Sequence, residues 1–84
     1  MYIHLGEDIS VRDSSVIGLF DLENTTIGPD TRAFLNKLEQ EGRVISVSAE
    51  MPKSFVICKE KGTETVYISP ISAATLRKRA GTMF

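Results

Sequence analysis

The sequence has 84 residues and a formal net charge of -1, and its 42% hydrophobic and 25% charged content is typical of one small globular domain. The only cysteine, Cys58, excludes an intramolecular disulfide, and with the only histidine, His4, it cannot complete a zinc site of four such ligands. Because the longest apolar stretch, residues 16–20, is too short for a membrane helix and the first residues lack a signal-peptide pattern, we expect a cytoplasmic protein with no membrane partner.

Two segments near the start alternate in polarity with a period of two. Residues 2–5 and 9–11 therefore predict two strands, joined by a tight turn at Gly6, Glu7 and Asp8. Residues 16–20, VIGLF, are apolar or glycine throughout, which predicts a central strand with both faces covered. Since so small a chain has few elements for two covers, a second subunit is expected to supply one. Residues 21–27 predict a polar loop.

A helix is predicted to begin at Pro29 and Asp30 and to end at Gly42, because proline suits a first helical turn and an acidic side chain suits its positive end. Its apolar side consists of Phe34, Leu35 and Leu38. Residues 44–49 then predict a strand in which Ile45, Val47 and Ala49 form the dry face. A loop is expected after it, at residues 49–53.

The last third of the sequence predicts a hairpin and a helix. Residues 54–59 and 64–69 form the two strands, around a turn at residues 60–63 that contains glycine. Ser72 is placed to cap the following helix, with Ile71 and Leu76 at the positions of a hydrophobic staple. The predicted fold is α+β: a small, mostly antiparallel sheet of about six short strands with two helices, in a single domain spanning residues 1–84.

The residues that most often perform chemistry stand alone in this sequence. His4 alternates onto the same face as Tyr2 without a nucleophile motif, and Cys58 shares a face with Val56, which predicts a buried, inert thiol. The acidic residues near positions 7 and 21 lie in or beside predicted turns, where such residues are common. We therefore expect no enzymatic activity, no catalytic residue, no metal site and no cofactor.

Charge is divided unevenly along the sequence. Residues 1–50 contain four lysines and arginines against nine acidic residues, whereas residues 51–84 contain six against two. With disulfides and metals excluded, self-association is the remaining aid to a chain of this size, so we predict a homo-oligomer. Acidic and basic halves of neighbouring subunits are then able to attract each other, or the basic half is free for a polyanion.

Arg77, Lys78 and Arg79 are the densest cationic cluster, and they fall on the last predicted helix. One interpretation is that they complement the helix dipole, which accounts for one or two cations more readily than for three. The other is a contact with phosphates or with a neighbouring subunit, and Lys53, Lys59 and Lys61 add positive charge to the same basic half.

Three stretches, MYIHLGEDISV, the apolar run that ends in FD, and YISPISAATLRKRA, resemble the RemA/RemB family of extracellular matrix regulatory proteins of Firmicutes, and most closely its RemB branch. The resemblance runs over nearly all 84 residues. It implies a small cytosolic regulator that assembles into a ring of identical subunits. The RemA branch is associated with binding DNA upstream of biofilm-matrix genes and activating them.

The sequence departs from the RemA branch at the loop that is expected to contact DNA. That loop is arginine-rich in RemA proteins, but residues 50–54 here contain a single cation, Lys53, so the resemblance transfers a DNA contact to this residue alone. Charge, not family likeness, adds Arg77, Lys78 and Arg79 as candidate DNA-binding residues.

Two hypotheses follow. The first is a transcriptional regulator of matrix or biofilm genes that binds duplex DNA mainly through backbone contacts as a homo-oligomeric ring, with a paralogous regulator as a further candidate partner. The alternative is an oligomeric structural or interaction protein without DNA binding, whose basic C-terminal helix docks on a neighbouring subunit or a protein partner.

Overall fold

The structure is a computed structural model that describes residues 1–22 and 28–80. In these ranges the chain forms six strands, two α-helices and one turn of 3-10 helix, which confirms the predicted α+β class. In chain order they are β1 (Tyr2–Gly6), β2 (Ile9–Arg12), η1 (Asp13–Ser15), β3 (Val16–Asp21), α1 (Pro29–Gln40), β4 (Val44–Ser46), β5 (Ser54–Glu60), β6 (Thr63–Ser69) and α2 (Ala73–Ala80). Most of the predicted polar loop, residues 23–27, lies outside the described residues.

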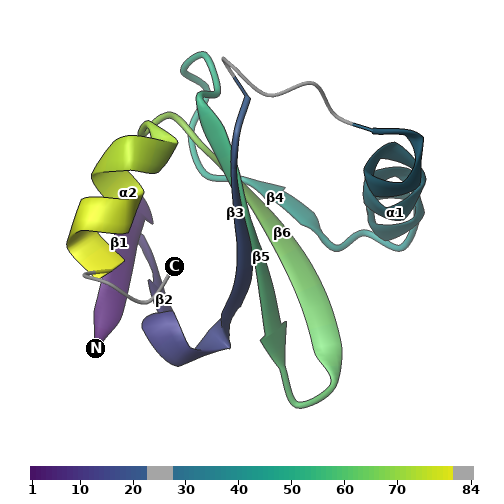
Figure 1. Cartoon of the computed structure of the whole chain (residues 1–84), viewed down its shortest axis with the longest axis horizontal. Helices are drawn as coiled ribbons and strands as arrows, with labels where there is room; N and C mark the ends of the chain where they lie inside the picture. The colour runs from purple at the N-terminus through teal and green to yellow at the C-terminus, as the bar shows by residue number, and fades with distance from the viewer. Residues whose placement is uncertain (23–27, 81–84) are drawn as a thin grey trace.

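The strands form two sheets instead of the single sheet that the sequence predicts (Figure 1). β1 and β2 pair as an antiparallel hairpin, and the other four strands form a sheet in the order β3-β5-β6-β4. Pairing is antiparallel except between β4 and β6, which run parallel, so this sheet is mixed. The parallel pair follows from α1, because a helix between β3 and β4 lets the chain return to the opposite edge of the sheet in the same direction.

β3 is an edge strand, so the prediction of a central strand at residues 16–20 is wrong. Its two-sided apolar pattern arises because Leu19 faces one core and Phe20 the other. The interior strand with both faces covered is β5, whose residues 54–58 are all buried. A run of apolar residues indicates that both faces of the sheet are covered, but it does not indicate how many neighbouring strands that strand has.

A β-bulge at Ile17 shapes this edge. Val16 lies opposite Cys58 and Gly18 opposite Ile57, which leaves Ile17 without a partner in β5 and 58% exposed. Glycine is needed at position 18 because a Cβ there would lie 2.7 Å from the ring of Phe20. That ring stacks on Phe55 with centroids 4.7 Å apart.

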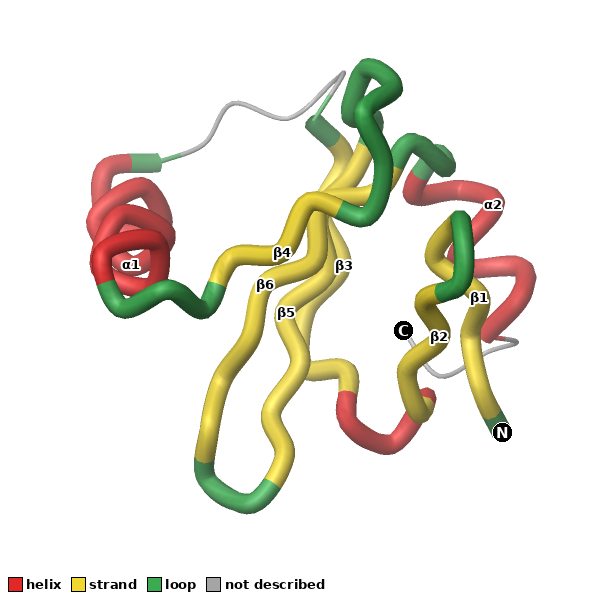
Figure 2. Tube along the Cα trace, turned by 180° about the vertical axis from the view of Figure 1, so that it is seen from behind, coloured by secondary structure: helices red, strands yellow, loops and turns green. Residues whose placement is uncertain are grey.

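Both faces of the four-stranded sheet are covered by the same chain (Figure 2). α1 covers one face, over the α1-side cluster of Leu38, Phe55, Ile57 and Val66. The first hairpin and α2 cover the other, over the hairpin-side cluster of Ile3, Leu5, Val11, Val47, Val56, Cys58 and Leu76. The expectation that a second subunit must supply one cover is therefore wrong, because α1 and the hairpin with α2 are sufficient.

The fully buried hydroxyl of Ser69 fixes the first hairpin to the end of β6. Its Oγ donates a hydrogen bond to the carbonyl oxygen of Leu5 at 2.6 Å and accepts one from the backbone N–H of Ile71 at 3.0 Å. Ser54 acts in parallel, since its Oγ donates to the carbonyl oxygen of Ile71 at 2.7 Å. Together these serines position the segment that leads from the sheet into α2.

The strand predicted at residues 44–49 is shorter and faces differently. β4 ends at Ser46, and its packed side chain is Val44, which lies against the α1-side cluster, whereas Ile45 is exposed. The predicted dry face is therefore wrong for Ile45 and for Ala49, which is exposed, although Val47, just past the strand, is buried. β4 is an edge strand, and its pairing with β6 covers only Val44 to Ser46.

The β5–β6 hairpin is confirmed, with a tighter turn than the sequence predicts. Strand pairing continues to Glu60 opposite Thr63, so the turn consists of Lys61 and Gly62 alone. Both have positive φ, 51° and 80°, as a two-residue type I′ turn requires. This tight turn therefore fixes the backbone position of Lys61 at this end of the sheet.

Candidate nucleic-acid interface

α2 is positioned by the local signals that the sequence predicts. Ser72 Oγ accepts a hydrogen bond from the backbone N–H of Thr75 at 3.2 Å, which confirms the N-cap. Leu76 is buried in the hairpin-side cluster and Ile71 packs against it, as expected for a hydrophobic staple. α2 therefore has one fixed inner face, and its last turn projects outward.

Arg77, Lys78 and Arg79 are all exposed in that last turn. The guanidinium of Arg79 donates a hydrogen bond from Nη1 to the carbonyl oxygen of His4 at 2.8 Å, which joins the end of α2 to β1. Within the described part of the chain, the ion pairs are those of the N-terminus with Asp13 and of Arg43 with Glu41, so none of the three has a carboxylate partner there. Arg77 and Lys78 are thus the least constrained cations of the cluster.

Lys53 lies at the other end of α2. Its backbone N–H donates to the carbonyl oxygen of Ser69 at 2.9 Å, and its carbonyl oxygen accepts from Leu22 at 2.9 Å, where β5 begins. From Ser72 to the last turn, α2 extends for roughly 10 Å at 1.5 Å per residue, and in Figure 1 that turn points away from the loop before β5. The structure therefore does not bring Lys53 together with Arg77, Lys78 and Arg79.

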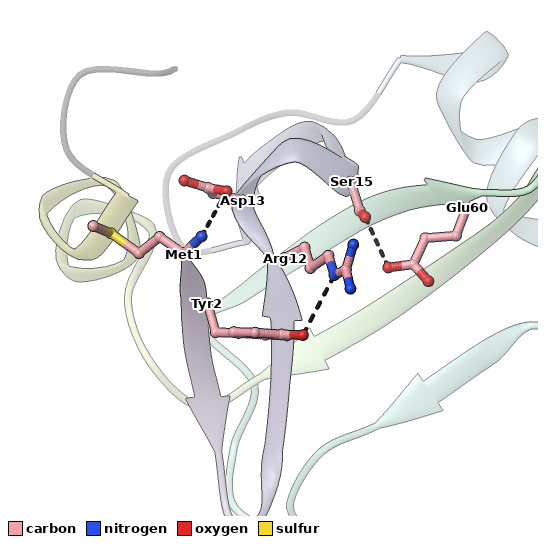
Figure 3. A network of polar contacts seen from close by, with 6 residues as sticks. All are labelled: Met1, Tyr2, Arg12, Asp13, Ser15 and Glu60. Carbon is pink, nitrogen blue, oxygen red and sulfur yellow. Dashed lines mark hydrogen bonds and ion pairs between the residues drawn. The ribbon is translucent and has the colours of Figure 1, made fainter.

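Two cations that the sequence did not single out as a pair line one hollow beside the first hairpin. Figure 3 shows the first of them, Arg12, against Tyr2. Arg12, at the end of β2, and Lys61, in the β5–β6 turn, border the same hollow. Arg12 Nε donates to Tyr2 Oη at 3.3 Å, and its guanidinium carbon lies 5.9 Å from the ring centroid. The pKa of Arg12 is raised by this hydrogen bond first and then by nearby charge, including that of Glu60.

We call this region the hairpin groove. It consists of two adjoining hollows of about 350 and 470 Å³ between β2 and the turn end of β5 and β6. Both hollows are lined by Val11, Glu60, Lys61 and Tyr67. The first also reaches Cys58, Thr63 and Thr65, and the second reaches Tyr2, Ser10 and Arg12. The groove is thus bordered by cations, hydroxyls and two tyrosine rings.

The floor of the groove contains shifted titratable groups. Burial, and then the charge of Glu60, raises the pKa of the Cys58 thiol to about 11. Burial is also the first cause that raises the pKa of Tyr67. Glu60 itself accepts a hydrogen bond from Ser15 Oγ at 2.7 Å, which fixes its carboxylate on the wall of the groove. Cys58 is therefore the buried, protonated thiol that the alternation in its strand predicts.

His4 is exposed on the same face of β1 as Tyr2, as predicted. Its Nε2 lies 2.7 Å from the carbonyl oxygen of Glu7, so the imidazole forms a local contact with the turn of the first hairpin. Across residues 1–22 and 28–80, no group of three or more histidine, cysteine or acidic side chains is placed to hold a metal ion. Neither helix there has the length and apolar content needed to cross a membrane.

The sequence pattern predicts the local positions of Arg12 and Lys61 but not their proximity. The period-two pattern places Arg12 on the outer face of its strand with Ser10, and the turn signal places Lys61 at a hairpin tip. Nothing in the pattern shows that these two elements, 49 positions apart in the sequence, lie against one groove. Their proximity is a tertiary property of the way the hairpin packs on the sheet.

Comparison with known proteins places the chain in a family. No protein-family model matches it. It is 38% identical over 84 residues to extracellular matrix regulatory protein B of Bacillus subtilis (strain 168), an alignment that covers all of this chain and 95% of the relative. With this identity over its whole length, the chain belongs to the family of extracellular matrix regulatory protein B.

Proposed function

We propose that this protein is a cytoplasmic, DNA-binding regulator of extracellular matrix genes that acts as a homo-oligomeric ring. Its relative is named an extracellular matrix regulatory protein, which supports the regulatory part of the proposal. The observation on which DNA binding depends most is the exposed cluster of Arg77, Lys78 and Arg79 in the last turn of α2. Exposed cations on a fixed helix suit phosphates better than base edges, so binding mainly through the DNA backbone is expected.

A ring makes so small a cluster effective. Two or three phosphate contacts from one subunit give weak binding, since each contributes a slope of only about -0.9 to log K against log salt concentration. A ring repeats the cluster at fixed spacing, and binding at one subunit raises the effective concentration of DNA at the next. Ring assembly would therefore give a higher overall affinity for DNA than one subunit alone.

The free edge of β3 supports self-association. Among the strands that the structure describes, β3 pairs with β5 alone, and its bulged residue Ile17 is 58% exposed. Unpaired strand edges with exposed apolar side chains are templates for contact with another chain. In the proposed ring, this edge is buried against a neighbouring subunit.

The test is a double substitution, Arg77→Ala with Lys78→Ala, because Arg79 also bonds to the first hairpin. We expect weaker binding of a fluorescent DNA duplex, measured by anisotropy, and a salt slope smaller by roughly 0.9 for each phosphate that the variant no longer neutralises. The matched control is Arg32→Ala with Lys37→Ala, which removes the same charge from the exposed face of α1 and should change binding much less. Equal affinity and slope for the α2 variant and the parent would contradict the assignment.

The acid-rich first part of the sequence favours a second candidate function. In it the basic end of α2 docks on the acidic surface of a neighbouring subunit or a protein partner, without DNA. The same α2 variant should then fall to a smaller mass by light scattering, whereas the DNA-binding proposal predicts an unchanged mass. Neither candidate assigns a catalytic role to the exposed His4.

A further inference from the structure

The hairpin groove gathers polar groups that the fold itself does not use. Arg12 and Lys61 border it, and neither forms an ion pair with another described residue. The nearby carboxylate of Glu60 is instead held by the Ser15 hydroxyl at 2.7 Å. Glu60 acts on Arg12 only through its charge, without forming an ion pair. Two cations that face one hollow and form no ion pair are suited to an anionic group that contacts both.

Hydroxyl groups line the inner part of the same groove. The side chains of Thr63, Thr65 and Tyr67 border it, and within residues 1–22 and 28–80 no hydrogen bond is formed by their hydroxyls. Glu60 adds a fixed carboxylate acceptor on the same wall. These groups can both donate to and accept from a ligand that bears several hydroxyls.

Two aromatic rings complete the groove. Tyr2 is 62% exposed at its outer end, with Arg12 against its ring, and Tyr67 lies where the two hollows meet. Hollows of about 350 and 470 Å³ are within the range of sites that bind small organic molecules. The size, the rings and the hydroxyl groups exceed what a bare inorganic anion would need.

We propose that the hairpin groove binds a mononucleotide. Arg12 and Lys61 hold its phosphate, and the base lies against the ring of Tyr67. The hydroxyls of the threonines and of Tyr67, together with Glu60, bond the ribose hydroxyls. Charge-assisted contacts to phosphate and stacking on an aromatic ring are the interactions that such a ligand offers. This site differs from the proposed DNA contact, because it uses none of the cations of α2 and does not depend on oligomerisation.

The experiment is calorimetric titration of the full chain with AMP. Arg12→Gln and Lys61→Gln should each weaken binding about tenfold, because each removes a charge-assisted contact to the phosphate. The matched control is Lys59→Gln. This lysine lies in β5, two positions before Lys61, but on the face away from the groove, because alternation places it with Ile57 and the α1-side cluster. The control should change the affinity less than twofold, and circular dichroism verifies that all variants fold.

Two further arms separate a nucleotide from its parts. Inorganic phosphate alone and adenosine alone should each bind at least about tenfold more weakly than AMP, since each lacks half of the contacts. Tyr67→Phe keeps the ring and removes the hydroxyl, so it should weaken AMP binding by a few-fold and leave phosphate binding unchanged. The proposal is wrong if millimolar AMP gives no binding heat, if phosphate binds as tightly as AMP, or if Lys59→Gln loses as much affinity as Lys61→Gln.

Discussion

Cys58 shows how strongly one side chain depends on the layer that covers it. It is 4% exposed in the hairpin-side cluster, next to Val56, and its thiol pKa is raised to about 11, first by burial and then by the charge of Glu60. Burial disfavours the thiolate, which is the form that attacks electrophiles and binds metals. The folded chain therefore holds this proton to a higher pH than the unfolded chain does.

We predict that Cys58 reacts with iodoacetamide at pH 8 about 100-fold more slowly in the folded protein than in the unfolded one. The thiolate fraction falls tenfold per pKa unit, and the pKa rises from 9.0 to about 11. The same shift makes the free energy of unfolding depend on pH. The protonated thiol stabilises the fold fully below pH 9.0, and this contribution is lost as the pH rises towards 11. Mass spectrometry of alkylation follows the rates, with protein in guanidinium chloride as the control. Equal rates in the two states would show that the thiol is not protected.

At this scale the sequence was informative where a residue follows its strand. Alternation alone predicted that Cys58 and Val56 face one way, and that His4 shares a face with Tyr2, and both are confirmed. It could not predict the Ser69 hydrogen bond to Leu5, because the two residues meet only after the first hairpin packs on the sheet. Local periodicity determines direction, whereas partners depend on tertiary packing.

Among the elements, the start of α2 was predictable, whereas β3 was predictable as a strand but not as an edge strand. The start of α2 depends on Ser72, Thr75 and the packing of Ile71 and Leu76, all within five positions of one another, so the sequence contains the signal for it. β3 has the composition of an interior strand, yet its place at the edge depends on which strands pair with β5. The cations of α2 were found because local sequence signals place that helix. The proximity of Arg12 and Lys61 was missed because it depends on how distant elements pack.

Leu76 is the side chain that should hold α2 in place, since it is 1% exposed within the hairpin-side cluster. We predict that Leu76→Ala lowers the free energy of unfolding by about 2–5 kcal/mol, through reduced burial and the cavity that remains. Urea unfolding followed by circular dichroism measures this decrease. The same substitution at Leu35, a half-buried residue beside a hollow under α1, serves as the control and should cost less. Equal decreases at the two positions would mean that α2 is not fixed through this contact.

In the molecule as a whole, the faces of the four-stranded sheet are covered, whereas its β3 edge is exposed. Each face of the four-stranded sheet is covered, but the edge strand β3 presents Ile17 to solvent through a bulge. The sequence predicted self-association from the small size of the chain and from an assumed missing cover. The structure replaces the second reason with an exposed edge, while the first remains.

We predict that Ile17→Lys lowers the mass of the assembly in solution, because a charged side chain at an interface between strand edges must lose its hydration. Size-exclusion chromatography with light scattering measures the mass, and an unchanged circular dichroism spectrum shows that the subunit still folds. Met51→Lys is the control, since Met51 is 82% exposed and the loop that contains it meets the Asp21 end of β3, opposite to the Ile17 end. If both variants keep the mass of the parent, the β3 edge is not the contact between subunits.

The bonds that fasten the first hairpin come from the far end of the sequence. Ser69 bonds to Leu5 across 64 positions, and Arg79 bonds to His4 across 75. Contacts this distant require closure of a loop almost as long as the chain, which slows folding. Ile3, Leu5 and Val11 precede by more than 30 positions the residues that cover them, Val47, Val56, Cys58 and Leu76. A chain truncated before residue 73 lacks both Leu76 and the Arg79 bond, so we expect its first hairpin to expose apolar surface and to become a substrate for chaperones and proteases.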